Sequence, residues 1–451
     1  MPNANANPER RFFIDLITRD ISLEDAILDM IDNAVDSLVR TNNINLYSEF
    51  INPVEGTRLA PSAEIVITFS TKQFTVKDNC GGISYETALN DIFRFGHPDP
   101  HRGASLSVFG IGMKRALFKL GRRIAIESHA SDSGFAMALL VNDWLADNNT
   151  NWAIPIEERE GEANPSKAGT KINITQLREE VAELIGNPKF QNKLINAIRE
   201  TYPFYLGRYV RIIVNNIAVE PEDLSIAESE KIKPAIETWE DGKVRATLIC
   251  GLLPREDARW TTEKSGWYIL CNGRTIVYAD RTKLTGWGDP LPQFMPKNRG
   301  FLGIIFFNSD HPEELPWKTT KRDINTESPV YVRTLKRMIA ASRLVTQFQN
   351  KMYESNDDDD PKEEYRDSVK DLKGVSATEQ AAERGRTEGI LTSQRFDFSP
   401  SISGTKYSSI QFKVKEEDLI RVKKRLGRLS MPNKEVGEKI FKYYIDRECT
   451  E

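Results

Sequence analysis

Three polar residues stand at spacings of four and three in one segment of the chain: Asp29, Asn33 and Asp36. Residues three and four apart are neighbours on a helix, so these side chains would share one face. A carboxylate and a carboxamide stacked in this way can orient a water molecule and complete the oxygen shell of a Mg²⁺ ion. A solvated polar stripe gives the same pattern, so this segment alone leaves both interpretations open.

The sequence around these residues predicts a helix that begins at Ser22. Ser22 and Asp25 resemble a capping box, in which the two side chains satisfy free N–H groups of the first turn. Apolar residues at helical spacing would form its buried stripe: Ile27, Met30, Ile31, Ala34 and Leu38. The polar residues would then lie on the adjoining face.

Three further segments combine glycine with groups that suit a nucleotide. Asp78 precedes a glycine pair at 81–82, which lets the backbone approach a flat ligand while the carboxylate accepts an amine proton. Gly110 and Gly112 open a predicted helix that ends at Gly121, and the free N–H groups of a helix start suit phosphate. Thr170 follows a glycine at the start of a predicted strand. Each segment alone is a common sequence.

Together, in this order and spacing, the four segments resemble the N box, the Asp-Gly-Gly box, the glycine-rich lid box and the Gly-Thr box of GHKL ATPases. That superfamily contains gyrase, heat-shock chaperone, histidine-kinase and MutL proteins. The resemblance implies an α/β fold over residues 1–203, the α+β two-layer sandwich known as the Bergerat ATP-binding fold. It also implies ATP and Mg²⁺ as cofactors and ATP hydrolysis as the activity. Short β-rich runs at 65–69, 74–76, 124–126 and 171–175 fit a single sheet covered by helices.

The resemblance assigns a role to each matching residue. Asn33 becomes the Mg²⁺ ligand, Asp29 takes the position of the general base, and Asp36 completes the nucleotide-binding face of the helix. Three residues would bind or adjoin the adenine: Asp78, Gly82 and Thr170. Three others would lie at the phosphates: Gly110, Gly112 and Lys114. Residues 91–109, with Gly96 and Gly103, would form the mobile lid.

Two positions depart from the family pattern. The general base is usually Glu, and Asp29 is shorter by one methylene, which moves the carboxylate by about an ångström or more. ATP hydrolysis is therefore expected to be slow or absent. Cys80 replaces the first glycine of the Asp-Gly-Gly box, and because Cys is small, nucleotide binding is expected to survive. None of the four histidines precedes the pocket, which argues against a histidine kinase with its phosphoacceptor helix.

Residues 204–350 predict a second α/β domain. Asn272-Gly273 between two β-rich runs predicts a hairpin with a type I′ turn, 301–307 predicts a strand, and 334–349 predicts a closing helix. This block resembles the transducer domain of MutL, gyrase and especially MORC-type ATPases. In those families a loop lysine reaches the γ-phosphate, which implies Lys321, with Lys318 as the alternative. A solvated basic loop is the competing interpretation.

The rest of the chain predicts a linker and a small terminal module. Residues 351–405 are acidic and polar and are interpreted as a flexible linker. Residues 406–451 predict a strand at 409–414 and helices at 416–426 and 434–445, a strand-helix-helix pattern that resembles a ribbon–helix–helix module. In that fold three residues would read bases: Ser409, Gln411 and Lys413. Three would contact phosphates: Lys423, Lys424 and Arg425. An oligomerisation or partner-docking module is the rival interpretation.

Composition limits the binding partners and the cellular compartment that the sequence predicts. The net charge of the 451 residues is −4, which argues against coating nucleic acid by bulk charge, although a local basic patch remains compatible. The four cysteines form no CxxC pair and predict neither a zinc site nor a disulfide framework, as expected in a reducing cytoplasm. No apolar run reaches the roughly 20 residues of a membrane span.

The resemblance to MORC and MutL proteins, together with the possible C-terminal DNA-binding module, implies an ATP-operated homodimeric clamp acting on duplex DNA. A chaperone-like ATPase acting on protein clients is the second hypothesis. The third is a nucleotide-sensing protein with little turnover.

Overall fold

The computed structural model describes residues 9–42, 44, 63–96, 105–107, 110–146, 152–222, 224–255, 260–353, 361–370, 372–377, 393–398, 410 and 412–449. The chain divides into two compact units. The first comprises Met1–Glu354 and Lys362–Ser401, and the second comprises Ser355–Pro361 and Ile402–Glu451. Most of the predicted lid lies outside the described residues, including Gly103.

The first unit begins with an eight-stranded sheet of order β5-β4-β3-β6-β2-β1-β7-β8. Its strands are β1 (Ala63–Ser70), β2 (Gln73–Asp78), β3 (Gly121–His129), β4 (Ser133–Leu140), β5 (Glu157–Glu160), β6 (Gly169–Leu177), β7 (Val210–Val214) and β8 (Ile217–Ala218). The pairings are antiparallel except for β1 with β7. Alternate residues such as Ile65 and Ile67 are buried, as period-two patterning predicts. The four predicted strands are confirmed.

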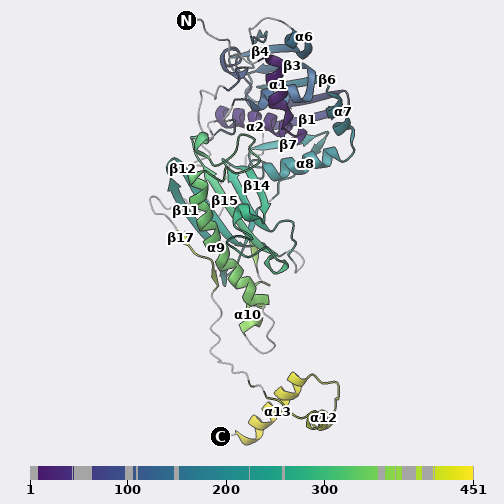
Figure 1. Ribbon diagram of the computed structural model, residues 1–451, viewed down its shortest axis with the longest axis vertical. Coiled ribbons are helices and arrows are strands. Elements are labelled where there is room, and N and C mark those ends of the chain that lie inside the picture. Colours follow the sequence, from purple (N-terminus) through teal and green to yellow (C-terminus); the bar gives the residue numbers. More distant parts are fainter. Residues whose placement is uncertain are drawn as a thin grey trace. The chain divides into compact units, whose positions relative to one another are not determined.

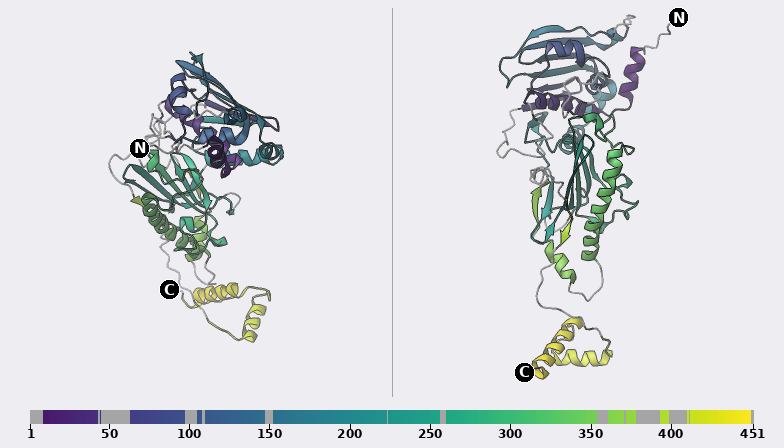
Figure 2. Two further views of the ribbon diagram at one scale, coloured as in Figure 1. Left: turned by 45° about the horizontal axis from the view of Figure 1, so that its top comes forward. Right: turned by 90° about the vertical axis from the view of Figure 1, so that its left-hand side faces the viewer.

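Helices cover this sheet and include α1 (Arg10–Arg19), α2 (Leu23–Thr41), α5 (Gly112–Leu120), α6 (Val141–Ala146), α7 (Glu179–Gly186) and α8 (Phe190–Thr201). A short turn α4 (Tyr85–Thr87) continues into the π-helix η1 (Ala88–Ile92). The predicted start of α2 is confirmed, because the Ser22 hydroxyl accepts a hydrogen bond from the Asp25 N–H at 3.1 Å. Figures 1 and 2 show α2 and α8 on the side of the sheet that faces the second domain.

The second domain is built on a six-stranded sheet of order β14-β13-β15-β12-β11-β17. Its strands are β11 (Ala235–Asp241), β12 (Val244–Leu252), β13 (Gly266–Cys271), β14 (Arg274–Asp280), β15 (Phe301–Asn308) and β17 (Ser393–Gln394). The long helix α9 (Pro329–Tyr353) lies along this sheet (Figure 1). Asn272 and Gly273 connect β13 to β14 with φ of 45° and 79°, which confirms the predicted hairpin turn.

Two predicted boundaries are wrong. The first sheet does not end at residue 203, because β7 and β8 complete it beyond that point. Residues 351–405 are not a flexible linker throughout, because parts of them pair with the second domain. The strand β16 (Lys373–Ser376) pairs with β9 (Ser225–Glu228), β17 pairs with β11, and β18 (Asp397–Phe398) pairs with β10 (Ile232–Lys233).

A few aromatic residues explain why this polar segment folds. Phe396 is buried and its ring lies 5.6 Å from that of Phe348 on α9. The ring of Phe398 lies 4.5 Å from that of Tyr365, in the helix α10 (Pro361–Ser368). Average composition hides such anchors, because a handful of rings is enough to attach short strands to an existing sheet edge.

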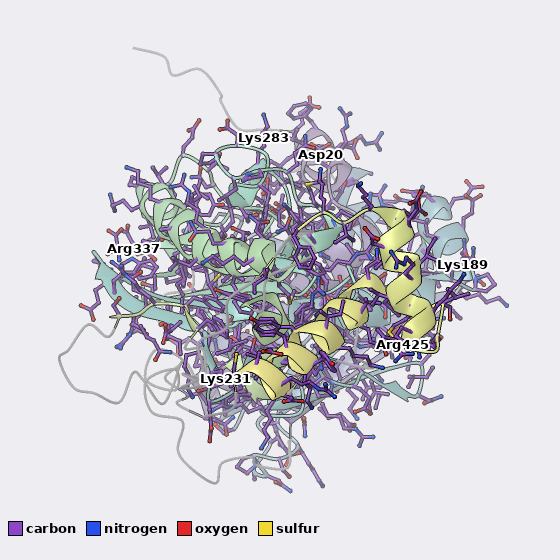
Figure 3. All side chains as sticks on the ribbon, turned by 90° about the horizontal axis from the view of Figure 1, so that it is seen from below. Asp20, Lys189, Lys231, Lys283, Arg337 and Arg425 are labelled. Atoms are coloured by element: carbon purple, nitrogen blue, oxygen red, sulfur yellow. The ribbon has the colours of Figure 1, made fainter. Side chains whose placement is uncertain are left out.

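The second unit consists of the helices α12 (Glu416–Arg425) and α13 (Asn433–Glu448), close to the predicted ranges. Figure 3 labels Arg425 on α12. The expected strand at 409–414 is not observed in the described residues 410 and 412–415, because no described segment of this chain pairs with them. Ser409 and Gln411 lie outside the described residues. Among the described helices, none is long and apolar enough to cross a membrane.

Candidate functional site

A cavity at the first turn of α5 collects six of the predicted site residues. Its lining includes Asp29, Asn33, Gly110, Gly112, Lys114 and Lys321. The first two come from α2, the next three from the segment that opens α5, and Lys321 comes from a loop of the second domain. Four other predicted residues lie outside this lining: Asp36, Asp78, Gly82 and Thr170.

Asp29 and Asn33 lie one helical turn apart on α2, and each already has a partner. The Asn33 side-chain amide donates to the Asp29 backbone carbonyl at 2.5 Å, and its carbonyl oxygen accepts from the Ser107 hydroxyl at 3.3 Å. The Asp29 carboxylate is 2% exposed and forms an ion pair with Arg115 of α5, with Nη2 and Oδ2 2.5 Å apart. The candidate base is therefore held from the facing helix.

Asp36 anchors the chain where it returns from the predicted lid. Its Oδ2 accepts from the Ser105 hydroxyl at 3.0 Å and its Oδ1 accepts from the Leu106 N–H at 2.6 Å. Burial raises the pKa of the Asp36 carboxyl, although the hydrogen bond from the Leu106 N–H and the charge of Lys321 oppose this. The expected face of three polar residues thus divides into two that line the cavity and one that holds the lid segment.

Lys114 braces the other end of the lid. Its ammonium donates to the carbonyl oxygens of Ile92 and Arg94 at 2.7 and 2.8 Å, at the end of η1. Burial lowers the pKa of Lys114 to about 8. Lys114 is 5% exposed and lines the cavity, and its ammonium is already bound to these two backbone carbonyls.

The three residues expected at the adenine form a second group where β2 and β6 lie side by side. The Asp78 carboxylate accepts from the backbone N–H groups of Cys80 at 2.9 Å and Thr170 at 3.3 Å. The Thr170 hydroxyl lies 2.8 Å from that of Ser128, and the Gly82 carbonyl accepts from Ser37 of α2. Burial raises the pKa of Asp78 to about 6, against the lowering effect of its two backbone hydrogen bonds.

A buried ion cluster joins α2 to the second domain. The Asp32 carboxylate binds the Lys321 ammonium at 2.7 Å, Nε of Arg274 at 2.9 Å and the Tyr202 hydroxyl at 2.7 Å. The Arg274 guanidinium also donates to the Lys321 backbone carbonyl. Burial raises the pKa of Asp32, but the charges of Arg274 and Lys321 outweigh it and hold the pKa below its usual value. Lys318, the alternative to Lys321, is half-exposed and pairs with Asp323.

Part of the chain is similar to a known family of ATPase domains. Residues 21–170 match the family model of histidine kinase-, DNA gyrase B-, and HSP90-like ATPases. The match supports a GHKL-type ATPase domain in this segment and supports ATP binding by it. It covers a third of the chain and includes α2, Asp78, the start of α5 and Thr170. A search of curated proteins gives no match to the chain.

Sequence reasoning missed four residues of this region: Asp32, Arg115, Tyr202 and Arg274. Two had a local signal, since Asp32 precedes Asn33 on a predicted helix and Arg115 follows Lys114. Arg274 stands directly after the predicted turn, yet its partner Asp32 lies 242 residues away. No sequence spacing reports such a contact.

The donor atoms and charges that line the cavity are compatible with a nucleotide bound to Mg²⁺. Among the described residues, no group of three or more His, Cys, Asp or Glu could hold a metal ion. Mg²⁺ in nucleotide sites commonly takes only one or two protein ligands and completes its shell with phosphates and waters, so a single carboxamide oxygen from Asn33 is compatible. Lys114 and Lys321 supply the lining with positive charge of the kind that a triphosphate requires.

Proposed function

We propose that this protein is an ATP- and Mg²⁺-dependent clamp or switch that hydrolyses ATP slowly. One observation carries the proposal: Lys321 of the second domain lines the same cavity as Asp29 and Asn33 of α2. A ligand that binds all three would therefore connect the two domains. Such a connection is what converts nucleotide binding into a change of domain position.

Each cavity residue has a proposed task. Asn33 would provide an oxygen ligand to Mg²⁺, which would supply charge neutralisation at the phosphates. Lys321 would exchange the Asp32 carboxylate for the terminal phosphate, while Arg274 stays on Asp32 and keeps that buried carboxylate neutralised. Asp29 would accept the proton of the attacking water. Lys114 would connect the cavity to the start of the lid through its hydrogen bonds to the carbonyl oxygens at the end of η1.

We further propose that the clamp closes as a homodimer and acts on duplex DNA, as the likeness to MORC and MutL proteins implies. The charge of the segment that contains α12 and α13 supports this client. Residues 412–449 contain 11 Lys and Arg against 7 Asp and Glu, a net charge of +4 in a chain of net charge −4. Lys413, Lys424 and Arg425 are exposed and available to phosphates, whereas Lys423 is bonded to Asn433 at 2.7 Å.

A chaperone-like action on protein clients is the second candidate, and exposed apolar side chains favour it. Phe412 is 70% exposed, and Phe441 and Tyr443 on α13 are more than half exposed. Large apolar side chains that remain exposed are candidates for contacts with other proteins. A nucleotide sensor with little turnover is the third candidate, and tight ATP binding without turnover would support it.

Binding measurements separate these candidates. Calorimetry of the parent with ATP and Mg²⁺ is expected to detect binding that Asn33→Ala weakens in the presence of Mg²⁺ and changes little in its absence. A labelled DNA duplex should bind with an affinity that falls steeply with salt and is reduced in a Lys413→Glu, Lys424→Glu, Arg425→Glu variant. Absence of ATP binding would refute the nucleotide proposal. Salt-insensitive binding of an unfolded protein in place of DNA would favour the chaperone-like candidate.

A further inference from the structure

The ion pair between Asp29 and Arg115 ties the candidate base to the facing helix. Arg115 lies on α5 and Asp29 on α2, with side chains 9% and 2% exposed and Nη2 2.5 Å from Oδ2. Both residues line the cavity that also contains Asn33 and Lys321. A guanidinium bound to one carboxylate oxygen fixes the rotamer of that carboxylate and leaves its other oxygen to serve a different partner.

The first turn of α5 leaves room for this carboxylate because it carries a glycine. A Cβ atom added at Gly112 would lie only 3.2 Å from both Cγ and Oδ2 of Asp29, so a residue larger than Gly at this position would crowd the carboxylate. Gly112 thus admits the Asp29 carboxylate beside α5, and Arg115, three residues further along the same helix, binds it there.

Burying the guanidinium of Arg115 costs free energy that the packing of α2 against α5 alone does not explain. Its Nε is buried and has no hydrogen-bond partner in the described structure. Buried polar groups are normally satisfied, and those that are not tend to occur where a site requires a particular position. An apolar residue could join α2 and α5 without this cost.

We propose that Arg115 is the positioning residue for Asp29, and that the Asp29–Arg115 pair performs the task of the single Glu expected at this position. The inference rests on the proposed function, because it concerns the base in ATP hydrolysis. In that step the water oxygen bonds to the γ-phosphorus while the bond to the ADP oxygen breaks. Asp29 takes the water proton and later releases it to solvent. Arg115 touches neither water nor phosphate and acts through the carboxylate it holds.

The test compares kcat, KM and ATP affinity in the full-length protein and its variants. Arg115→Ala is expected to lower kcat by about 10- to 100-fold, since small displacements of a reacting group have effects of that size. The dissociation constant for ATP should stay within about threefold of the parent. Guanidinium ion added at low millimolar concentration should restore part of the kcat of Arg115→Ala, and Arg115→Lys should retain an intermediate kcat. Asp29→Glu should not exceed the parent.

The control variant is Arg159→Ala, which removes an exposed arginine paired with Glu157 at 2.7 Å. Its kcat should equal that of the parent and should not respond to guanidinium. The inference is overturned if Arg115→Ala retains the parent kcat, or if ATP affinity falls while kcat is kept, which would make Arg115 a phosphate contact. A lost kcat that guanidinium does not restore, together with a lower melting temperature, would also overturn it by showing a structural role. Failure of the proposed function has another signature: the parent would not bind ATP, or Asn33→Ala would hydrolyse it normally.

Discussion

Replacing Asp32 with Asn should destabilise this protein more than removing either of its cationic partners. In the parent, the cluster buries one carboxylate, one guanidinium and one ammonium, with exposed side-chain fractions of 0%, 1% and 6%. Its net charge is therefore +1. Asp32→Asn leaves a net charge of +2 without a counter-ion, whereas Arg274→Met leaves a balanced pair of Asp32 and Lys321.

The geometry sets the expected magnitudes. Breaking a buried ion pair by removing one partner costs about 3–5 kcal/mol, because the remaining charge is uncompensated. Asp32→Asn removes the partner of two cations at once, so its loss of unfolding free energy should reach the upper part of that range. Arg274→Met loses its bond to Asp32 and its bond to the Lys321 carbonyl, which together cost about 2–3 kcal/mol. Lys321→Met, which loses one charged bond, should cost about 1–3 kcal/mol.

Urea unfolding followed by circular dichroism and by tryptophan fluorescence would measure these differences at pH 7. The Arg159→Met variant is the matched control, because it breaks an exposed ion pair and should change stability by less than about 1 kcal/mol. Because the pKa of Asp32 is lowered on folding, its contribution to stability should be fully present above the ordinary aspartate pKa and be lost as the pH falls from there through the lowered pKa of the folded state. An Asp32→Asn protein within about 0.5 kcal/mol of the parent, or one more stable than Arg274→Met, would refute this reasoning.

Three further predictions concern other parts of the first unit. Folding raises the pKa of Asp78 from 3.8 to about 6, so Asp78→Asn should be more stable than the parent at pH 8 by up to about 3 kcal/mol. This gain in stability should shrink as the pH falls below 6, and equal gains at pH 8 and pH 5 would contradict the pKa shift. Gly273→Ala should lower the unfolding free energy by about 2 kcal/mol or more, because φ is 79° and the new Cβ would lie 2.6 Å from the Phe204 ring. Gly242→Ala, where the new Cβ would have no atom within 4 Å, should lower it by about 1 kcal/mol, and equal losses in the two variants would contradict the packing argument. Phe396→Ala should expose the polar segment to limited proteolysis at unchanged nucleotide affinity, and an unchanged digestion pattern would show that this ring does not anchor it.

Local patterns in the sequence predicted the elements that local physics determines. The Ser22 cap and the buried stripe of α2 follow from short-range rules, and so does the turn at Asn272-Gly273. The nucleotide-binding boxes were recognisable because each keeps its residues within one short segment. Asp29, Asn33 and the start of α5 accordingly line one cavity.

Contacts between distant segments could not be predicted in this way. The Asp32–Arg274 and Asp29–Arg115 pairs bring together residues far apart in sequence, and only the packing of whole elements decides which charges meet. The polar segment after α9 was misread for a related reason. Its average composition is that of a linker, but Phe396 and Phe398 find an existing hydrophobic surface on which short strands can form.

The most direct test of the central claim is steady-state ATP turnover by the purified protein with Mg²⁺, with and without duplex DNA, beside Asn33→Ala and Asp29→Ala. Glu157→Ala, at an exposed position in β5, serves as the control and should match the parent. We expect slow turnover in the parent protein, an increase in that turnover when DNA is added, and no turnover in either pocket variant. Turnover in Asn33→Ala equal to that of the parent would contradict the assignment of the nucleotide site.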